Sequence, residues 1–213
     1  MKIGIIGASG KAGSLILKEV VERGHEVTAI VREAAKVQNQ QVSVVEKNIF
    51  DLKAEDVKGF DVVVNAFNAV PGEEPQHIAA GKVLIEAFKG APQTRLVVVG
   101  GAGSLFVDEA KTTRVMETPG FPAEYLPTAT NMGKNLEELQ TTTEIQWTYI
   151  SPAGFFNPEG KRTGSYQKGG DVLILNAEGN SYISYADYAI AVLDEIENPQ
   201  HRNERFSVVG EAE

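Results

Sequence analysis

The sequence feature that most limits how this chain can fold is a glycine-rich turn close to its first residue. The stretch Gly7-Ala8-Ser9-Gly10-Lys11-Ala12-Gly13 follows an apolar, β-branched run, Lys2–Ile6, and leads into the amphipathic segment Lys11–Arg23. A strand, a tight turn and a helix are therefore predicted in direct succession. In such a unit the first glycine permits a sharp turn, the second lets the backbone approach a ligand, and the third lets the helix pack closely.

The same turn predicts a kind of ligand. The first backbone N–H groups of a helix have no partner within the helix, and the helix dipole makes this end partly positive. We therefore expect the turn to hold the pyrophosphate of a dinucleotide, although a tight turn that binds nothing is the alternative. A P-loop is excluded, because Ala12 replaces the required Ser or Thr and Ile5 replaces the required first glycine. The expected pyrophosphate contacts are Gly7, Ser9, Gly10, Lys11, Ala12 and Gly13.

Strand-like and helix-like segments alternate along most of the chain. Several strand candidates consist almost entirely of Val and Ile, which is typical of parallel strands buried on both faces. The predicted strands are Lys2–Ile6, Glu26–Val31, Val42–Glu46, Asp61–Asn65, Arg95–Val99 and Gln146–Ile150. The predicted helices are Lys11–Arg23, Gln76–Phe88, Asn131–Gln140 and Tyr185–Ile196. This alternation predicts an α/β fold, a Rossmann-type doubly wound parallel sheet.

The composition changes after Pro152, where Gly, Asn, Tyr and Ser become frequent. Gly164–Gln167 and Val172–Leu175 flank Lys168-Gly169-Gly170-Asp171, which predicts a β-hairpin. A last strand is expected at Arg205–Val209. The segment is too short for an independent unit, so we predict one NAD(P)-binding domain, 1–213, in which 153–183 forms a small C-terminal cap on the substrate side.

The end of the second strand bears on the choice of cofactor. NAD sites usually carry an acidic residue there, whereas this chain has Arg32, a side chain suited to the 2′-phosphate of NADP(H). Glu33 leaves NAD(H) open, although the start of a short helix is the favoured interpretation. After the third strand, Asp51 is expected to accept a hydrogen bond from the adenine amino group, to cap a helix over Leu52–Val57, or to do both.

Residues that follow the later strands are expected to line the rest of a dinucleotide site. Asn65, Ala66 and Phe67 would lie under the cofactor at the sheet edge, and Gly100, Gly101 and Ala102 would lie near the nicotinamide ribose. The backbone of Pro152 and Ala153 is expected to hold the carboxamide. Phe155 would stack on a planar substrate, or form a hydrophobic hinge of the cap. Tyr125 belongs to a Pro-rich loop that is either a mobile lid or a plain exposed loop.

The motifs in combination resemble a known family. Ile5–Gly13 is generic alone, but it occurs here with 99–105 (VGGAGSL), 130–134 (TNMGK), 149–153 (YISPA) and 184–189 (SYADYA). Over nearly its whole length the chain resembles the atypical short-chain dehydrogenases of the NADH-flavin reductase type, close to the biliverdin reductase B and NmrA-like groups. This resemblance implies an NAD(P)-binding reductase.

One departure from short-chain dehydrogenases narrows the chemistry. Most of them use Tyr-x-x-x-Lys to move the proton of a carbinol, but Thr130 occupies the tyrosine position before Lys134. Alcohol, ketone, epimerase and dehydratase reactions are therefore disfavoured. Flavin reduction needs mainly proximity of two stacked rings, and solvent can supply the proton. We therefore expect NADPH-dependent reduction of a flavin or a similar planar acceptor, such as FMN, FAD or a quinone, which is a substrate and not a prosthetic group.

Two residues are candidates for a catalytic role. Lys134 would bind the nicotinamide ribose, with a solvent-facing lysine as the alternative. Ser104 would contact substrate, with a helix cap as the alternative. The rival function is an NADP-sensing regulator of the NmrA type without turnover. Such a regulator could fill the space beside the nicotinamide and expose an apolar patch to a protein partner.

Composition excludes several other classes. The formal net charge of −9 disfavours binding to nucleic acid or anionic membranes. The absence of cysteine excludes disulfides and thiolate chemistry, and the three histidines form no metal pattern, with His77 expected at the surface. No apolar run approaches the roughly 20 residues that span a bilayer. We expect a cytoplasmic protein, either a monomer or a homodimer.

Overall fold

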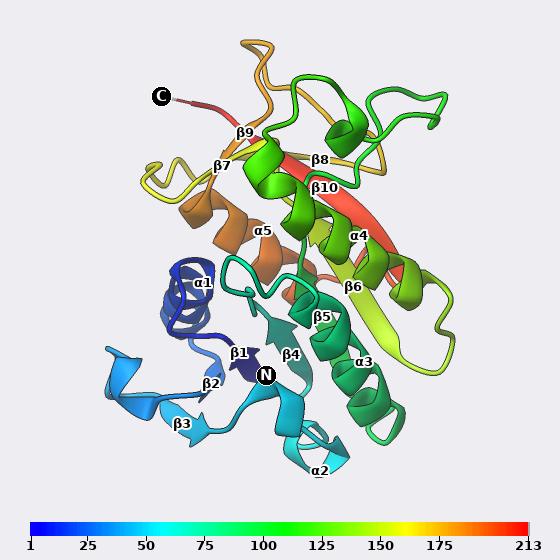
Figure 1. Cartoon of the computed structure of the whole chain (residues 1–213). Coiled ribbons are helices and arrows are strands. Elements are labelled where there is room, and N and C mark those ends of the chain that lie inside the picture. Colours follow the sequence, from blue (N-terminus) through cyan, green and yellow to red (C-terminus); the bar gives the residue numbers. More distant parts are fainter. Residues whose placement is uncertain (213) are drawn as a thin grey trace.

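The computed structural model of the chain describes residues 1–212. Eight strands form one sheet in the order β3-β2-β1-β4-β5-β6-β10-β8, and helices cover both of its faces (Figure 1). All neighbouring pairs from β3 to β10 are parallel, whereas β8 runs antiparallel to β10. The strand order reverses between β1 and β4, as in doubly wound dinucleotide-binding sheets. The predicted Rossmann-type α/β fold is therefore confirmed.

The parallel strands lie within one residue of their predicted bounds. They are β1 (Lys2–Ile6), β2 (Glu26–Val31), β3 (Ser43–Glu46), β4 (Val62–Asn65), β5 (Arg95–Val99), β6 (Gln146–Ser151) and β10 (Glu204–Gly210). Every residue of β4 is buried, and β5 is buried except at its last residue. The Val and Ile runs form central strands because helices bury both faces of the sheet there.

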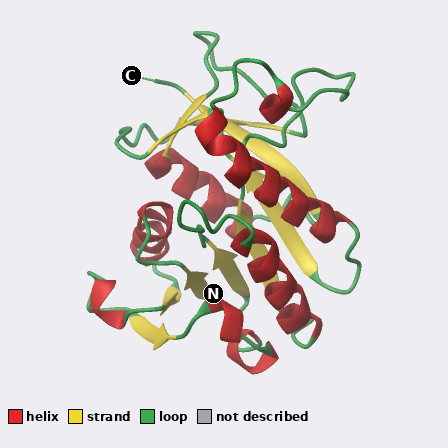
Figure 2. Ribbon diagram, viewed as in Figure 1, coloured by secondary structure: helices red, strands yellow, loops and turns green. Residues whose placement is uncertain are grey.

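Two pairs of helices provide these covers (Figure 2). On one face, α1 (Lys11–Glu22) packs beside α5 (Tyr185–Glu197). On the other face, α3 (Gln76–Lys89) packs beside α4 (Leu126–Gln140). Each pair closes an apolar layer over the sheet, and Trp147 lies in the layer under α3 and α4. Within residues 1–212, no helix combines the length and apolar character needed to cross a membrane.

Two predicted helix starts are wrong. The helix expected at Leu52–Val57 is a single turn, α2 (Ala54–Val57). Asp56 stabilises the start of this turn, because its carboxylate accepts the N–H of Lys53, the residue before α2, at 2.8 Å. Asp51 is therefore not a helix cap. Helix α4 begins at Leu126, a turn earlier than predicted, because a proline is tolerated where helix N–H groups are unpaired.

Asp51 lies in one of four short 3-10 turns. They are η1 (Ala34–Lys36), η2 (Ile49–Asp51), η3 (Val115–Glu117) and η4 (Ala123–Tyr125). The last of these leads directly into α4, so much of the Pro-rich loop is ordered as turns, while Tyr125 itself is exposed.

The hairpin predicted around residues 168–171 is also wrong. Lys168 and Gly169 are strand residues of β8 (Tyr166–Gly169), which pairs with β10. The open edge of β10 offers a longer partner than Val172–Leu175, which forms no strand. Two further short strands, β7 (Phe155–Asn157) and β9 (Tyr182–Ser184), form a separate parallel pair. The 153–183 segment thus gathers at the carboxyl-end edge of the sheet, at the top of Figure 1.

Candidate functional site

The turn between β1 and α1 requires glycine at two positions. Gly7 has φ of +76°, and a Cβ there would lie 2.7 Å from the carbonyl oxygen of Ala66 at the end of β4. A Cβ on Gly13 would overlap the carbonyl oxygen of Gly7. Gly10 differs, because its Cβ position meets only that same oxygen at 3.2 Å and otherwise faces open space. Two glycines therefore shape the turn, and the third leaves room above it.

The first turn of α1 presents backbone donors that the protein leaves unused. Gly10 precedes the helix with no side-chain cap, and no acidic residue occurs in the first turn. The first helical bond runs from the Ser14 N–H to the Gly10 oxygen at 2.9 Å, so the N–H groups of Lys11, Ala12 and Gly13 precede it. Ser9 and Lys11 are exposed beside them. Uncapped N–H groups, the helix dipole and an exposed lysine suit an anion such as pyrophosphate.

Three charged side chains follow the end of β2. Two of them bind each other, and the third does not take part. The Glu33 carboxylate binds the Lys36 ammonium at 2.6 Å, and this interaction lowers the pKa of Glu33. Arg32 is exposed, and within residues 1–212 no side chain forms a hydrogen bond or an ion pair with its guanidinium. As predicted, Glu33 precedes a short helix, η1. Arg32 is therefore a cation at this edge without a hydrogen-bonded partner, although its charge also helps Lys36 to lower the pKa of Glu33, and Glu33 is bound to Lys36.

The end of β4 meets the same edge. The Asn65 side chain accepts the Phe67 N–H at 3.1 Å and turns the chain sharply after the strand. Phe67 is half-buried, with its ring edge-on to Phe50 and to His77 at centroid distances of 5.9 Å and 5.7 Å. Asp51, at the end of η2, is exposed and lines an open groove of about 750 Å³ between α2 and α3. Asp51 and Phe67 therefore both lie on the side of the sheet covered by α3.

His77 is buried in α3, so its expected surface position is wrong. Its Nε2 accepts the Ala69 N–H at 3.4 Å. Burial lowers the pKa of His77, although the charge of Glu74 partly opposes this. No local pattern predicts this role, because the partner of the ring is a loop amide and not a charged residue. A neutral His77 therefore supports the loop that follows Asn65.

The glycine pair after β5 is shaped by a tyrosine from β6. A Cβ on Gly100 would overlap the Tyr149 ring, and the Gly101 N–H donates to the Tyr149 oxygen at 3.3 Å. Complete burial raises the pKa of Tyr149 to about 12. Sequence reasoning assigned Tyr149 no role in the site, although it lies in the motif 149–153 (YISPA). The Tyr149 hydroxyl is thus a fixed structural support for the turn Gly100-Gly101-Ala102.

The two candidate catalytic residues lie differently from what was expected. Ser104 is buried, and its hydroxyl accepts an N–H of Arg205 at 3.1 Å. No helix follows Ser104 directly, so the helix-cap alternative is wrong. Lys134 is exposed on α4, and none of residues 1–212 pairs with its ammonium. Their catalytic roles stay predictions, without a contact in the structure that supports them.

The end of β6 leads straight into the segment 153–183. Pro152 and Ala153 are buried directly after Ser151, the last residue of β6. Phe155 is 60% exposed and lies against Tyr182 at a centroid distance of 5.7 Å. The next residue, Phe156, packs on Tyr185 of α5 at a centroid distance of 3.8 Å. Phe155 is therefore the aromatic ring of this segment that is open to a ligand.

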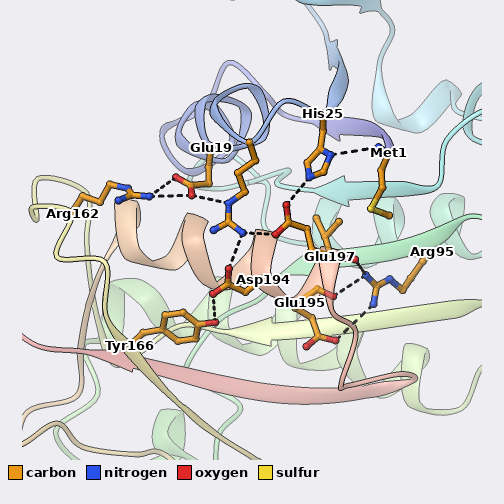
Figure 3. Close-up of polar contacts among 11 residues, drawn as sticks. Met1, Glu19, His25, Arg95, Arg162, Tyr166, Asp194, Glu195 and Glu197 are labelled. Carbon is orange, nitrogen blue, oxygen red and sulfur yellow. Dashed lines mark hydrogen bonds and ion pairs between the residues drawn. The ribbon is translucent and has the colours of Figure 1, made fainter.

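A polar network ties the same segment to the helices α1 and α5 (Figure 3). The carboxylate of Glu19 is buried in α1 and binds Arg23 at 3.0 Å and Arg162 at 3.1 Å. Arg23 also binds Asp194 of α5 at 2.8 Å, and the Tyr166 hydroxyl donates to Asp194 at 2.8 Å. Arg162 and Tyr166 thus link 153–183 to the helix that follows the glycine turn.

The sheet order, the open first turn of α1 and the small residues at the strand ends are those of a nicotinamide-dinucleotide site. Residues 7–199 match the model of a family of NAD(P)H-binding proteins. The chain belongs to this NAD(P)H-binding family. Within the family, the resemblance to the NADH-flavin reductase group found in the motifs is confirmed by the proteins that the chain matches.

Three relatives of this NAD(P)H-binding chain illustrate the match. YwnB of Bacillus subtilis, an uncharacterized protein, is 70% identical over 213 residues, which cover 100% of both chains. A Streptococcus pneumoniae protein of known structure, provisionally described as an NADH-flavin reductase, is 44% identical with a TM-score of 0.93 and covers 99% of this chain and 100% of its own. A Bacteroides thetaiotaomicron protein, provisionally described as an epimerase, is 39% identical with a TM-score of 0.88 and covers 98% and 96%.

Proposed function

We propose that the chain is an NADPH-dependent reductase that passes hydride to a flavin or a similar planar acceptor. The observation that carries the choice of cofactor is the pairing at the end of β2. Glu33 is engaged with Lys36 at 2.6 Å, whereas the guanidinium of Arg32 is exposed. A planar guanidinium binds phosphate with two parallel hydrogen bonds, which an NADH ribose cannot match. The geometry therefore favours a 2′-phosphate at this position.

The chain's own contribution is to hold and orient the dinucleotide. The N–H groups at the start of α1 would bind the pyrophosphate, with Ser9 and Lys11 at its sides. The ends of β4, β5 and β6 would place the nicotinamide along the sheet edge, with the backbone of Pro152 and Ala153 at the carboxamide. When bound, NADPH supplies the hydride. In the whole reaction NADPH, a proton from solvent and oxidised flavin give NADP⁺ and reduced flavin.

The residue at the position of the catalytic tyrosine supports this type of acceptor. Thr130 stands where a catalytic tyrosine would precede Lys134. Tyr149 does not replace it, because its hydroxyl is buried, has a pKa raised to about 12 and accepts the Gly101 N–H. A carbonyl or epimerase substrate would need such an acid, whereas a flavin does not. The exposed ring of Phe155 offers a planar surface on which an isoalloxazine can stack.

Binding titrations with NADPH and NADH test the cofactor assignment. We expect Arg32→Ala to raise the Kd for NADPH by about 10- to 100-fold, the value of a charge-assisted bidentate contact, and to leave the Kd for NADH nearly unchanged. Arg202→Ala, which removes another exposed arginine, is the matched control and should change neither. Equal affinity of the unaltered protein for both dinucleotides would contradict the assignment.

Turnover tests the reductase assignment separately. Oxidation of NADPH is followed with FMN, FAD, riboflavin and a quinone as acceptors. We expect turnover with at least one flavin and a preference for NADPH over NADH that Arg32→Ala abolishes. Tight binding of NADPH without turnover on any of these acceptors would instead support a dinucleotide-sensing regulator.

A further inference from the structure

Two chain segments form neighbouring walls at the carboxyl-end edge of the sheet. One is the loop that follows β5, residues 100–106, and the other is the stretch 171–173 within 153–183. The Phe106 N–H donates to the Asp171 oxygen at 2.9 Å, and the Leu173 N–H donates to the Phe106 oxygen at 2.8 Å. These two backbone bonds place the walls side by side, at the edge where the proposed function locates the acceptor.

A single side chain from β10 joins both walls. Arg205 is 3% exposed. Its Nε and Nη2 bind the Asp171 carboxylate, each at 2.8 Å, and its Nη1 donates to the Ser104 hydroxyl at 3.1 Å. Ser104 belongs to the loop after β5, and Asp171 begins the other wall. One guanidinium therefore fixes both segments to the same strand of the sheet.

Opposite charges stabilise the contact between Arg205 and Asp171. Burial alone would raise the pKa of Asp171, but the hydrogen bonds and charges of Arg205 and of Lys111, at 3.2 Å, outweigh burial and lower it. Asp171 therefore stays ionised at neutral pH, and the buried Arg205 keeps its counter-ion. Loss of Asp171 would leave the buried Arg205 charge without its counter-ion, whereas loss of Arg205 would leave the partly exposed Asp171 with Lys111.

Side-chain packing does not fill the space between the two segments beside Arg205. A small pocket of about 70 Å³ adjoins Ser104, Asp171 and Arg205 and extends to Gly133 of α4. Such a space has room for about two waters at roughly 30 Å³ each. Because the side chains are not packed solidly at this point, the polar bonds of Arg205 add to the two backbone bonds that hold the walls together.

We propose that Arg205 is a positioning residue that sets the acceptor side of the site by clamping the loop after β5 to the 171–173 stretch. This inference rests on the proposed reductase function. Arg205 lies far from the pyrophosphate turn, since β10 lies four strand spacings from β1, roughly 19 Å. The clamp therefore governs how the acceptor and the nicotinamide end of the site lie relative to each other, while the pyrophosphate contacts at the start of α1 stay in place.

The experiment compares Arg205→Met and Arg205→Lys with a matched control, Arg95→Met. Arg95 is an equally buried arginine, but its Nη2 binds the Glu195 and Ile196 carbonyl oxygens at the amino-terminal end of β5 (Figure 3). We expect Arg205→Met to raise the KM for flavin by about tenfold or more, because small misplacements of a reactant are costly, while the Kd for NADPH changes much less, since the pyrophosphate turn and Arg32 are untouched. Arg205→Lys should recover part of the loss. Arg95→Met should lower the Tm without raising the KM for flavin.

A second readout does not depend on turnover. In Arg205→Met, the backbone amides of Phe106 and Leu173 should exchange with deuterium faster than in the unaltered protein, while those of the strands β1 and β4 stay protected. Unchanged exchange at Phe106 and Leu173, or an equal rise of the KM for flavin in Arg95→Met, would overturn the clamp. If the unaltered protein reduces no acceptor, the reductase proposal fails alone, and amide exchange still decides the clamp.

Discussion

The carboxylate of Glu33 lies 2.6 Å from the ammonium of Lys36, so the acidic side chain after β2 is engaged within its own turn. Removal of this partner should free Glu33 for the ribose hydroxyls that NADH presents. We expect Lys36→Ala to lower the preference for NADPH over NADH by about two- to fivefold, the value of an exposed ion pair. Kd values for both dinucleotides measure the effect, with the exposed Lys58→Ala as control. An unchanged preference would mean that Glu33 does not reach the ribose.

Substitutions of two glycines in the first turn should affect stability and NADPH binding differently. Gly10 has φ of −78°, which any residue adopts, and its Cβ position faces open space except for the Gly7 oxygen. We expect Gly10→Ala to keep a Tm close to that of the unaltered protein and to raise the Kd for NADPH about tenfold, since the methyl group occupies the approach to the pyrophosphate.

Gly13→Ala is the counterpart, because its methyl group would overlap the Gly7 carbonyl oxygen. Overpacking of this kind costs about 1–3 kcal/mol, so both the Tm and the NADPH affinity should fall. Thermal melts and titrations of the two variants provide the comparison. Equal effects of the two substitutions on Tm would contradict the different roles assigned to these glycines.

The Arg23 network should contribute measurably to stability. Arg23 binds Glu19, Asp194 and Glu197, and Glu19 is buried. We expect Arg23→Ala to lower the free energy of unfolding by about 1.5–3 kcal/mol, the order of a hydrogen bond between charged groups, because Glu19 keeps Arg162 but loses its bond to Arg23. Denaturant melts of Lys18→Ala, which removes an exposed ion pair with Glu22 at 3.7 Å, provide the control, expected to change by less than about 0.5 kcal/mol. Similar losses in both variants would contradict this account.

His77 should make the stability sensitive to mild acid. Burial lowers its pKa in the folded state below the ordinary value of 6.5, so the unfolded chain binds the proton more readily. The stability due to neutral His77 is fully present above that value and is lost as the pH falls from 6.5 toward the folded-state pKa. Thermal melts over this pH range should show a smaller decline of Tm with falling pH in His77→Gln than in the unaltered protein. An identical decline would show that protonation of His77 is not responsible.

The central strands could be predicted because their burial is a local property of the sequence. Runs such as Val62–Val64 have no polar face, and only a sheet covered on both sides accommodates them. The predicted hairpin at residues 168–171 is wrong because strand pairing is not a local property of the sequence. Its Gly-Gly pair is a strong local turn signal, but the partner that β8 finds is the distant edge of β10. A tertiary contact overrode the local preference there.

Some residues of the candidate site could likewise be predicted from the sequence, and others could not. The glycine turn and Arg32 could be predicted as candidates from their place after a strand, because the carboxyl ends of parallel strands share one edge. Tyr149 and Arg205 could not, since their roles depend on partners far along the chain, and His77 could not, since its partner is the backbone N–H of Ala69. The hydroxyl of Ser104, for example, is bound by Arg205, 101 residues later, and no local pattern in the sequence records this pairing.

The most direct test of the reductase proposal is a single-turnover reaction without oxygen, in which the protein with bound NADPH is mixed with FMN. Absorbance records the oxidised flavin and NADPH together. The account predicts that both decrease at the same rate and in equal amounts, faster than in the mixture without protein, and that Arg32→Ala slows the reaction at limiting NADPH. Retention of NADPH by the protein while FMN stays oxidised would contradict the account and leave a protein that binds the dinucleotide without using it.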